Sequence, residues 1–286
     1  MSNTQTTMEP DAAMMRRHVG HLFEGWLDGC QDGKIELAWT DGRDGRLRHA
    51  SIFGTDQLDE LVKCAAAENR KERQNVYIGQ ALRKPSIAPF GRCKDEDFYA
   101  LTAFYTDIDD DVVLAAAARN KALCCIPTAT VVTGRHPHPR AQMLWRLKTP
   151  VRDAELCRRQ NMAIAKTLGG DTAVVNPSRV LRLAGSIAWP RKEGRIAELT
   201  ELLLPASGKP AEYLPEQVAK AFPPVAVALS ASPQAGGTLG ASYAGEAAPS
   251  TTRAATLQIG TTNLSVDDCL GHVRAGNHWH DNLVRL

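Results

Sequence analysis

Residues 101–111 of this 286-residue chain read LTAFYTDIDDD, an apolar run that leads directly into carboxylates at alternate positions. In a β-strand successive side chains point to opposite faces, so Asp107 and Asp109 share one face while Ile108 points into the core. Two carboxylates held side by side repel one another unless a cation lies between them, and hard oxygen ligands suit Mg²⁺ or Mn²⁺. The competing interpretation is a strand that ends in a solvated acidic turn, with Asp110 or Asp111 capping the helix that follows.

A third carboxylate, Asp171, follows the double glycine 169–170 some sixty residues downstream. Together with Asp107 and Asp109 it would form a two-metal site, in which two ions about 3.5–4 Å apart stabilise the attacking and leaving oxygens of a phosphoryl displacement. The alternative for Asp171 is an ordinary turn residue after a helix. The acidic trio therefore predicts a site for two Mg²⁺ or Mn²⁺ ions.

Cationic side chains accompany the predicted turns, among them Arg140, Arg179, Arg182 and Lys192. Nucleoside triphosphates and nucleic-acid backbones require such groups, and arginine can bind phosphate with two parallel hydrogen bonds. Because Arg179 and Arg182 are three residues apart, we expect them on one side of a helical turn that begins at residues 176–177. Each of these residues, taken singly, is also compatible with an ordinary surface position.

His136 and His138 alternate with prolines in the segment RHPHPR, residues 135–140. The prolines keep this segment extended, and no nearby cysteine or third histidine completes a zinc ligand set. We therefore expect a phosphate contact or a plain loop role for His138. The chain also lacks the GxxxxGK[ST] loop of P-loop ATPases.

Composition is that of an ordinary globular protein, with a net charge of +2 and a pI near 8.2. This mildly basic balance permits a nucleic-acid partner without requiring one. The seven cysteines have no CxxC spacing, which argues against a disulfide framework and a structural zinc site. No apolar run could span a membrane, and the polar N-terminus lacks a signal-peptide core, so we expect a cytoplasmic protein.

Alternating and β-branched runs predict strands, and 3.6-residue periodicity predicts helices between them. The predicted strands cover residues 34–39, 46–53, 74–79, 101–108, 128–132, 141–147 and 196–199, and the predicted helices cover residues 56–71, 112–121 and 154–168. Thr55 and Asp153 are the expected N-caps of the first and last helix, and the double glycine 169–170 is the expected end of the last one. Residues 83–85 indicate a basic loop.

Domain boundaries follow shifts in composition. We expect an N-terminal tail with a short helix over residues 1–29 and a catalytic domain over residues 30–222. Residues 223–262 are rich in Ala, Gly, Ser, Thr and Pro, which is typical of a flexible linker. Residues 263–286 indicate the start of a further helical segment.

The order of these motifs resembles that of the archaeo-eukaryotic primase superfamily, specifically its plasmid and prophage replication branch. Residues 104–109 resemble the hydrophobic-DxD first motif, residues 132–147 the second motif, and residues 170–186 the third. Residues 75–79 resemble the strand that precedes the first motif in this branch. The likeness covers about residues 30–205.

The second motif contains one departure from the family pattern. The family usually has a histidine where this chain has Gln142, three residues before Trp145. A glutamine can donate a hydrogen bond to phosphate but carries no positive charge. Either Arg140 or His138 supplies the missing charge, or activity is reduced.

The resemblance implies an α+β primase–polymerase fold, with an RRM-like antiparallel sheet and a flanking N-terminal α/β unit. It implies primer synthesis on single-stranded DNA from NTPs or dNTPs by two-metal nucleotidyl transfer, with a helicase domain or subunit as a candidate partner. Asp107, Asp109 and Asp171 would be the catalytic metal ligands. The candidate phosphate-binding side chains are Gln142, His138, Arg140, Arg179, Arg182 and Lys192.

Two other functions compete with this one. A non-catalytic replication-initiator or single-strand-binding module would keep the fold without polymerisation, and Gln142 is the main support for it. A phosphohydrolase of the haloacid-dehalogenase type requires Thr or Val two places after its second aspartate, where this chain has Asp111. The intact acidic trio favours the polymerase.

Overall fold

A computed structural model describes residues 8–25, 29–205 and 212–224 of the chain. The predicted linker, from residue 225 onward, and the predicted C-terminal helical segment lie outside the described residues. Among the described helices, none combines the length and the apolar character that a membrane-spanning segment requires.

The N-terminal part of the fold contains two helices and four strands. Their bounds are α1 Ala12–Phe23, β1 Lys34–Thr40, β2 Leu47–Gly54, α2 Leu58–Arg70, β3 Val76–Gly79 and β4 Ala81–Arg83. Helix α2 was expected to begin with Thr55 as its cap, but Gln57 occupies that position and the Thr55 hydroxyl donates instead to the Gln31 carbonyl, 2.7 Å away.

The remaining elements begin with a 3-10 turn at Asp95–Asp97. They are β5 Phe98–Ile108, α3 Val113–Ala122, β6 Ala129–Gly134, β7 Arg140–Val151, α4 Ala154–Leu168, β8 Val180–Arg182, β9 Ile187–Ala188, β10 Glu198–Leu199, β11 Glu201–Leu203 and α5 Pro215–Ala221. Helix α4 has the predicted caps: Asp153 accepts from the backbone at its start, and Gly169 adopts a left-handed conformation at its end. Helix α3 has Val112 rather than Asp110 or Asp111 at its N-cap position.

Nine of the described strands form one antiparallel sheet in the order β11-β6-β7-β5-β4-β1-β3-β8, with β2 pairing on β1. Strands β3 and β4 are separated only by Gln80. They join the two parts of the sheet, because β3 pairs with β1 and β8 while β4 pairs with β1 and β5. The expected α+β fold with a large antiparallel sheet is confirmed.

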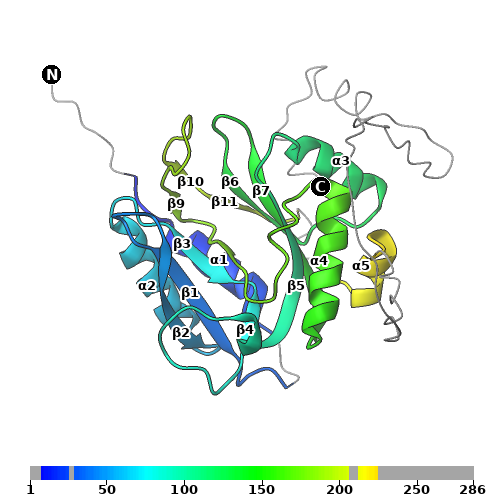
Figure 1. Ribbon diagram of the computed structural model, residues 1–286, viewed down its shortest axis with the longest axis horizontal. Coiled ribbons are helices and arrows are strands. Elements are labelled where there is room, and N and C mark those ends of the chain that lie inside the picture. The colour runs from blue at the N-terminus through cyan, green and yellow to red at the C-terminus, as the bar shows by residue number, and fades with distance from the viewer. Residues whose placement is uncertain (1–7, 26–28, 206–211, 225–286) are drawn as a thin grey trace, which may run out of the picture.

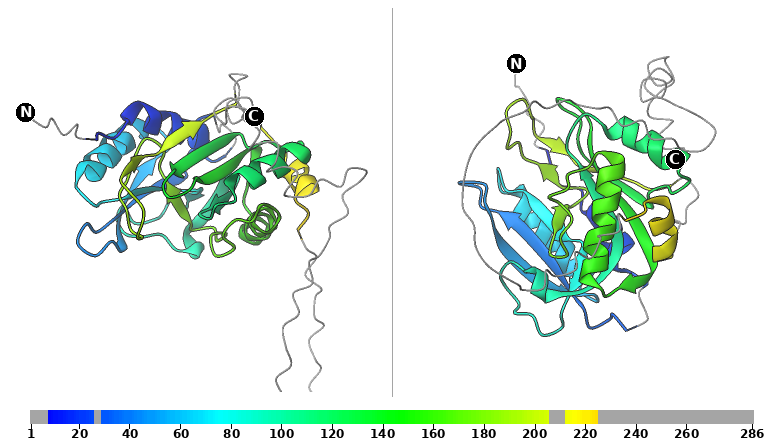
Figure 2. Two further views of the ribbon diagram at one scale, coloured as in Figure 1. Left: turned by 90° about the horizontal axis from the view of Figure 1, so that it is seen from above. Right: turned by 45° about the vertical axis from the view of Figure 1, so that its right-hand side comes forward.

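Helices cover both faces of this sheet. Figure 1 shows α4 lying along β5, and the view from above in Figure 2 places α1 on the opposite face. This explains why β5 is a nearly continuous buried run, in which only Tyr99 and Asp107 are partly exposed. Asp107 therefore lies where a buried strand reaches the edge of the core.

Arg83 is the clearest departure from the predicted secondary structure. The sequence predicts a basic loop at residues 83–85, but Arg83 ends β4 and is fully buried. Its guanidinium donates to Glu36 Oε2 at 2.8 Å and to the carbonyls of Pro177 and Ser178 at 2.9 and 3.0 Å. This buried ion pair connects β1 and β4 to the loop that precedes β8.

Candidate functional site

The free edge of β5 brings Asp171 to Asp107. Strand β4 pairs only with the first part of β5, up to Leu101, so among the described residues the second part has no strand partner on that side, and the Tyr105 N–H donates to Asn161 Oδ1 at 3.1 Å. The backbone N–H of Asp171 donates to the carbonyl of Asp107 at 2.8 Å, and on the other side of β5 Gln142 is the ladder partner of Asp107. Two of the predicted carboxylate residues are therefore fixed to each other through the main chain.

Gly170 makes this close approach possible. A Cβ atom at Gly170 would lie 2.1 Å from the Thr106 hydroxyl oxygen and 3.0 Å from the Asp107 carbonyl oxygen. Contacts this short do not occur between real atoms, so only glycine allows the loop to lie against β5 at this point. The Asp171 carboxylate then accepts from the backbone N–H of Ala173 at 2.8 Å, which makes a local turn at the exposed end of the motif.

Asp107 carries an unbalanced charge. Burial and the charges of Asp109 and Asp171 raise its pKa to about 6, while a hydrogen bond with Gln142 and the charge of Arg182 act in the opposite direction. Among the described residues, no Lys, Arg or His forms an ion pair with Asp107. The raised pKa means that a nearby cation would stabilise the ionised form of Asp107.

Asp109 has the opposite environment. Its Oδ2 accepts from Lys192 Nζ at 2.6 Å and from Arg195 at 2.8 Å, and the Arg140 guanidinium lies 3.9 Å from its Oδ1. Burial acts to raise the pKa of Asp109, but the bonds from Arg195 and Lys192 hold it below its usual value. The second carboxylate of the motif is therefore already neutralised by protein cations.

A polar cleft of about 190 Å³ opens over the two aspartates of β5. Its walls come from β3, β5 with the residue that follows it, β6, β7, β8, β9 and the segment after β9. The lining residues are Tyr77, Asp107, Asp109, Thr133, Arg140, Gln142, Arg182, Ala188, Trp189, Pro190, Arg191, Arg195 and Ile196. Carboxylates on one wall thus face guanidinium groups on the others.

Arg182 was expected on a helical turn with Arg179, and this prediction is wrong. Arg182 lies in strand β8 opposite Tyr77, with its guanidinium 4.8 Å from the centre of the Tyr77 ring. Arg179 precedes the strand and does not line the cleft; it donates to the Ala173 carbonyl instead. Its charge acts on Arg92 and Tyr105, which places it beyond the cleft, near the buried Arg83.

The predicted phosphate-binding residues of the second motif surround the carboxylates. His138 Nε2 lies 3.0 Å from the Asp109 carbonyl oxygen. Arg140 is almost fully buried and bonds to the carbonyls of His136 and His138 and, at 3.2 Å, to Glu198. Arg140 therefore braces the β6–β7 hairpin and presents only part of its charge to the cleft.

The three carboxylates are the type of ligand that a divalent cation prefers, but their side chains do not converge on one point in this structure. Among the described residues, no three His, Cys, Asp or Glu side chains converge into a metal-binding cluster. Asp107 lacks a cation and is close enough to Asp109 and Asp171 for their charges to raise its pKa. Hard oxygen donors with mutual repulsion fit Mg²⁺ or Mn²⁺, provided that Asp109 exchanges its contacts with Lys192 and Arg195.

Two cleft residues were not singled out by the sequence analysis. Arg195 is an ion-pair partner of Asp109, and Tyr77 supports Arg182. Arg195 belongs to the basic turn Arg191–Arg195, so its charge was a usable signal. Tyr77 occupies an ordinary strand position, and only its pairing with β8 reveals its place.

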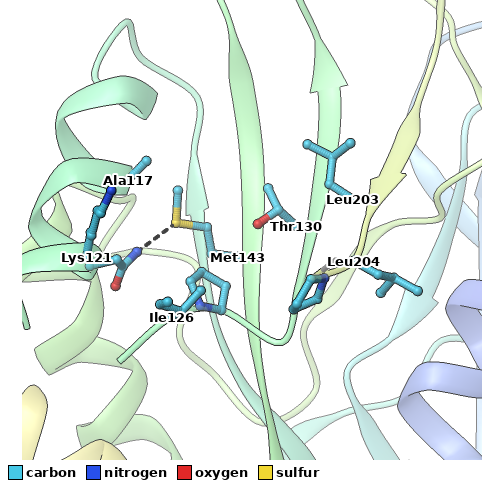
Figure 3. A pocket seen from close by; sticks show the side chains of 10 residues that line it. Ala117, Lys121, Ile126, Thr130, Met143, Leu203 and Leu204 are labelled. Atoms are coloured by element: carbon cyan, nitrogen blue, oxygen red, sulfur yellow. Dashed lines mark hydrogen bonds between the residues drawn. The ribbon is translucent and has the colours of Figure 1, made fainter. Parts of the chain in front are cut away.

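A second pocket contrasts with the cleft in its chemistry. It lies between α3, β6, β7 and the end of β11, has a volume of only about 30 Å³, and is lined mainly by apolar side chains (Figure 3). Its one drawn hydrogen bond joins Asn120 Nδ2 to Met143 Sδ at 3.2 Å. With no carboxylate or guanidinium in its lining, this pocket has no groups for phosphoryl chemistry.

Comparison with known proteins gives structural matches alone. No family model matches the sequence, and no curated protein does. The fold is similar to the AEP domain of the cyanophage S-2L primase–polymerase, with a TM-score of 0.51 and 18% identity over 76% of this chain and 100% of that chain.

Two structures of the primase RepB′ are also similar, at 17% identity. The first has a TM-score of 0.49 and covers 72% of this chain and 62% of that one. The second is described as its catalytic domain in complex with initiator DNA, has a TM-score of 0.48, and covers 73% of this chain and 93% of that one.

The likeness to the cyanophage domain establishes the fold. This chain has the same α+β fold as that primase–polymerase domain, so the fold expected from the resemblance is confirmed.

Proposed function

We propose that this protein is a DNA primase–polymerase that synthesises primers on single-stranded DNA during plasmid or prophage replication in the cytoplasm. The fold supports this function class, since the cyanophage primase–polymerase domain has the same architecture. The observation that carries the proposal is Asp107, a carboxylate without an ion-pair partner among the described residues, which lines a cleft together with Arg140, Arg182, Arg191 and Arg195.

The cleft has the charge distribution that a nucleoside triphosphate requires. Arg182 and Arg195 line it, and Lys192 lies at Asp109, so three cations can neutralise phosphate oxygens beside the carboxylates. Arg140 and His138 would fix the hairpin that carries Gln142. Gln142, held against Asp107, would donate to a phosphate oxygen in place of the usual histidine.

Arg179 would serve a different phosphate from the others. Because it lies outside the cleft, near Arg92 and the buried Arg83, its charge would act on the template strand. Phosphate contacts of this kind position a strand without reading its sequence.

Asp107, Asp109 and Asp171 would hold two Mg²⁺ or Mn²⁺ ions. When bound, such ions lower the pKa of an attacking 3′-hydroxyl and stabilise the pyrophosphate leaving group. The protein contributes the rigid strand β5, the backbone bond from Asp171 to Asp107, and the neighbouring cations that orient the triphosphate.

Primer synthesis on unprimed single-stranded DNA tests this proposal. Labelled NTPs or dNTPs would be supplied with Mg²⁺ or Mn²⁺ to the wild type and to Asp107→Ala/Asp109→Ala. The matched control is Asp110→Ala/Asp111→Ala, which removes two charges from the exposed end of the same acidic stretch. We expect metal-dependent products from the wild type and the control, and none from the Asp107/Asp109 variant.

The alternative is a replication-initiator or single-strand-binding module with this fold and no polymerisation. Gln142 in place of the usual histidine favours it. DNA binding by the wild type and both variants, without product from any of them, would support this alternative and contradict the polymerase. A helicase domain or subunit added to the assay would test whether a partner is required.

A further inference from the structure

Two buried asparagines form hydrogen bonds with the backbone of residues 187–189, the segment that leads to the cationic side of the cleft. Asn69 on α2 donates to the carbonyl of Ile187 at 3.0 Å and accepts from its N–H at 2.6 Å. Asn75, just before β3, donates to the carbonyl of Trp189 at 3.1 Å and accepts from its N–H at 2.8 Å. Each amide thus satisfies both backbone groups of one residue, as a neighbouring strand would.

Each asparagine makes one further side-chain contact, and these contacts differ: Asn69 Nδ2 also donates to the carbonyl of Gln74 at 3.0 Å, whereas Asn75 contacts Arg182. Its Oδ1 also accepts a hydrogen bond from the Arg182 guanidinium. The amide orientation follows from this chemistry, because two N–H donors meet the oxygen and a carbonyl meets the nitrogen. Asn75 is fully buried, so water cannot replace any of these bonds without rearrangement.

The Arg182 side chain makes two direct contacts among the described residues, and its charge also acts on Asp107. One is the face of the Tyr77 ring at 4.8 Å, and the other is Asn75 Oδ1. The Tyr77 ring keeps the guanidinium against its face but does not fix its position across that face, because a cation–π contact has little directionality. The hydrogen bond to Asn75 therefore fixes where the charge lies in the cleft.

We propose that Asn75 is a positioning residue for nucleotide binding, which holds Arg182 toward the triphosphate and ties it to the segment around Trp189. This inference rests on the proposed function and names the residue through which one of its cations acts. The segment continues through Arg191 and Lys192 to Arg195, so one buried amide connects two sources of positive charge in the cleft.

The test compares Asn75→Ala and Asn75→Asp with Asn69→Ala. Asn75→Asp keeps both acceptor bonds, loses the bond to the Trp189 carbonyl and gives Arg182 a carboxylate partner, so it should weaken phosphate binding by neutralising the guanidinium. Asn69→Ala removes the same type of backbone clasp without a contact to Arg182 and is the matched control for stability.

Nucleotide affinity would be measured with the fluorescent analogue mant-dATP, and KM and kcat with primer extension. Both Asn75 variants should raise Kd and KM about tenfold with a smaller change in kcat, while Asn69→Ala stays within about twofold. In an Arg182→Ala background, Asn75→Ala should raise Kd much less than it does in the wild type, because the part of its effect that acts through Arg182 is already lost.

Three outcomes would overturn the inference. They are wild-type affinity in both Asn75 variants, an equal loss of affinity in Asn69→Ala, and additive losses with Arg182→Ala. A wild type that binds no nucleotide and makes no primer would be a different failure, since it would remove the proposed function itself.

Discussion

Strands β1 and β5 each carry one carboxylate that is largely removed from bulk water. The first is paired with cations of its own chain and the second is not. Glu36 on β1 is fully buried and accepts from Arg83 at 2.8 Å, from Arg92, and from the backbone N–H of Cys93 at 3.1 Å. Asp107 on β5 has an amide neighbour, Gln142, and two further carboxylates close by.

The difference separates a structural charge from a functional one. A buried carboxylate costs free energy unless it is paired and hydrogen-bonded, and Glu36 meets that requirement through groups of its own chain. Asp107 does not meet it, so the fold retains an unfavourable charge at one position. Such a position is where a ligand cation would gain most, which is why perturbed carboxylates concentrate at functional sites.

The largest effect on the free energy of unfolding is expected for Glu36, the carboxylate that is paired within its own chain. Glu36→Ala leaves the fully buried Arg83 without its counter-charge and should lower the free energy of unfolding by roughly 3–5 kcal/mol, measured by urea denaturation. Asp44→Asn is the control, because Asp44 pairs with Arg48 at 2.6 Å on the surface and its loss should change stability by less than about 1 kcal/mol. Equal effects would contradict the contrast between buried and exposed pairs.

Removal of the Asp107 carboxylate should stabilise the fold, whereas removal of the Glu36 carboxylate should destabilise it. Asp107→Asn should raise the free energy of unfolding by roughly 1–3 kcal/mol in chelator at pH 7–8. The folded state has a pKa of about 6 against an ordinary 3.8, so above pH 6 it carries a charge that the unfolded chain carries at no cost. Below about pH 4 the group is protonated in both states, and the gain should vanish.

Thermal unfolding across this pH range measures the effect. A destabilised Asp107→Asn variant at neutral pH would show that the carboxylate is satisfied after all. Addition of Mn²⁺ should stabilise the wild type and leave the variant nearly unchanged.

Gly170→Ala should have a smaller effect on stability and a clear one on the site. The new methyl group would overlap the Thr106 hydroxyl and approach the Asp107 carbonyl. We expect a loss of roughly 1–2 kcal/mol together with loss of primer synthesis, because Asp171 is displaced. Thr106→Ala in the same chain removes the nearest obstacle and should restore part of both; no rescue would indicate that the contact does not limit the loop.

Lys192→Gln should have the smallest effect on stability. Lys192 is mostly exposed, and Arg195 still neutralises Asp109 after its removal. The free energy of unfolding should change by less than about 1 kcal/mol, while the KM for nucleotide rises if Lys192 binds phosphate. A large loss of stability would show that the ion pair, and not the ligand, is the main role of this residue.

Local patterns in the sequence sufficed for the elements around the first motif. The alternation of Asp107 and Asp109, the cap at Asp153 and the left-handed Gly169 are each decided within a few residues. Arg83 and Arg182 were misassigned because their strands have only three residues each, and their partners Glu36 and Tyr77 are distant in the chain. Short strands are stabilised by tertiary pairing, which no local propensity encodes.

The position of Asp171 likewise depends on tertiary pairing that local sequence does not encode. The order of the motifs indicated that it joins the first two carboxylates, but its actual link is a backbone bond to the free edge of β5. That edge exists because β4 ends early, a property of the whole sheet.

Mn²⁺ binding measured by electron paramagnetic resonance tests the central claim most directly, because free Mn²⁺ gives a signal that is lost on binding. Titration of the wild type should show saturable binding, Asp107→Asn should bind at least about tenfold more weakly, and the exposed neighbour variant Asp110→Asn should match the wild type. If Asp107→Asn bound Mn²⁺ as tightly as the wild type, the unbalanced carboxylate of β5 would not be a metal ligand, and the proposed two-metal site would be wrong.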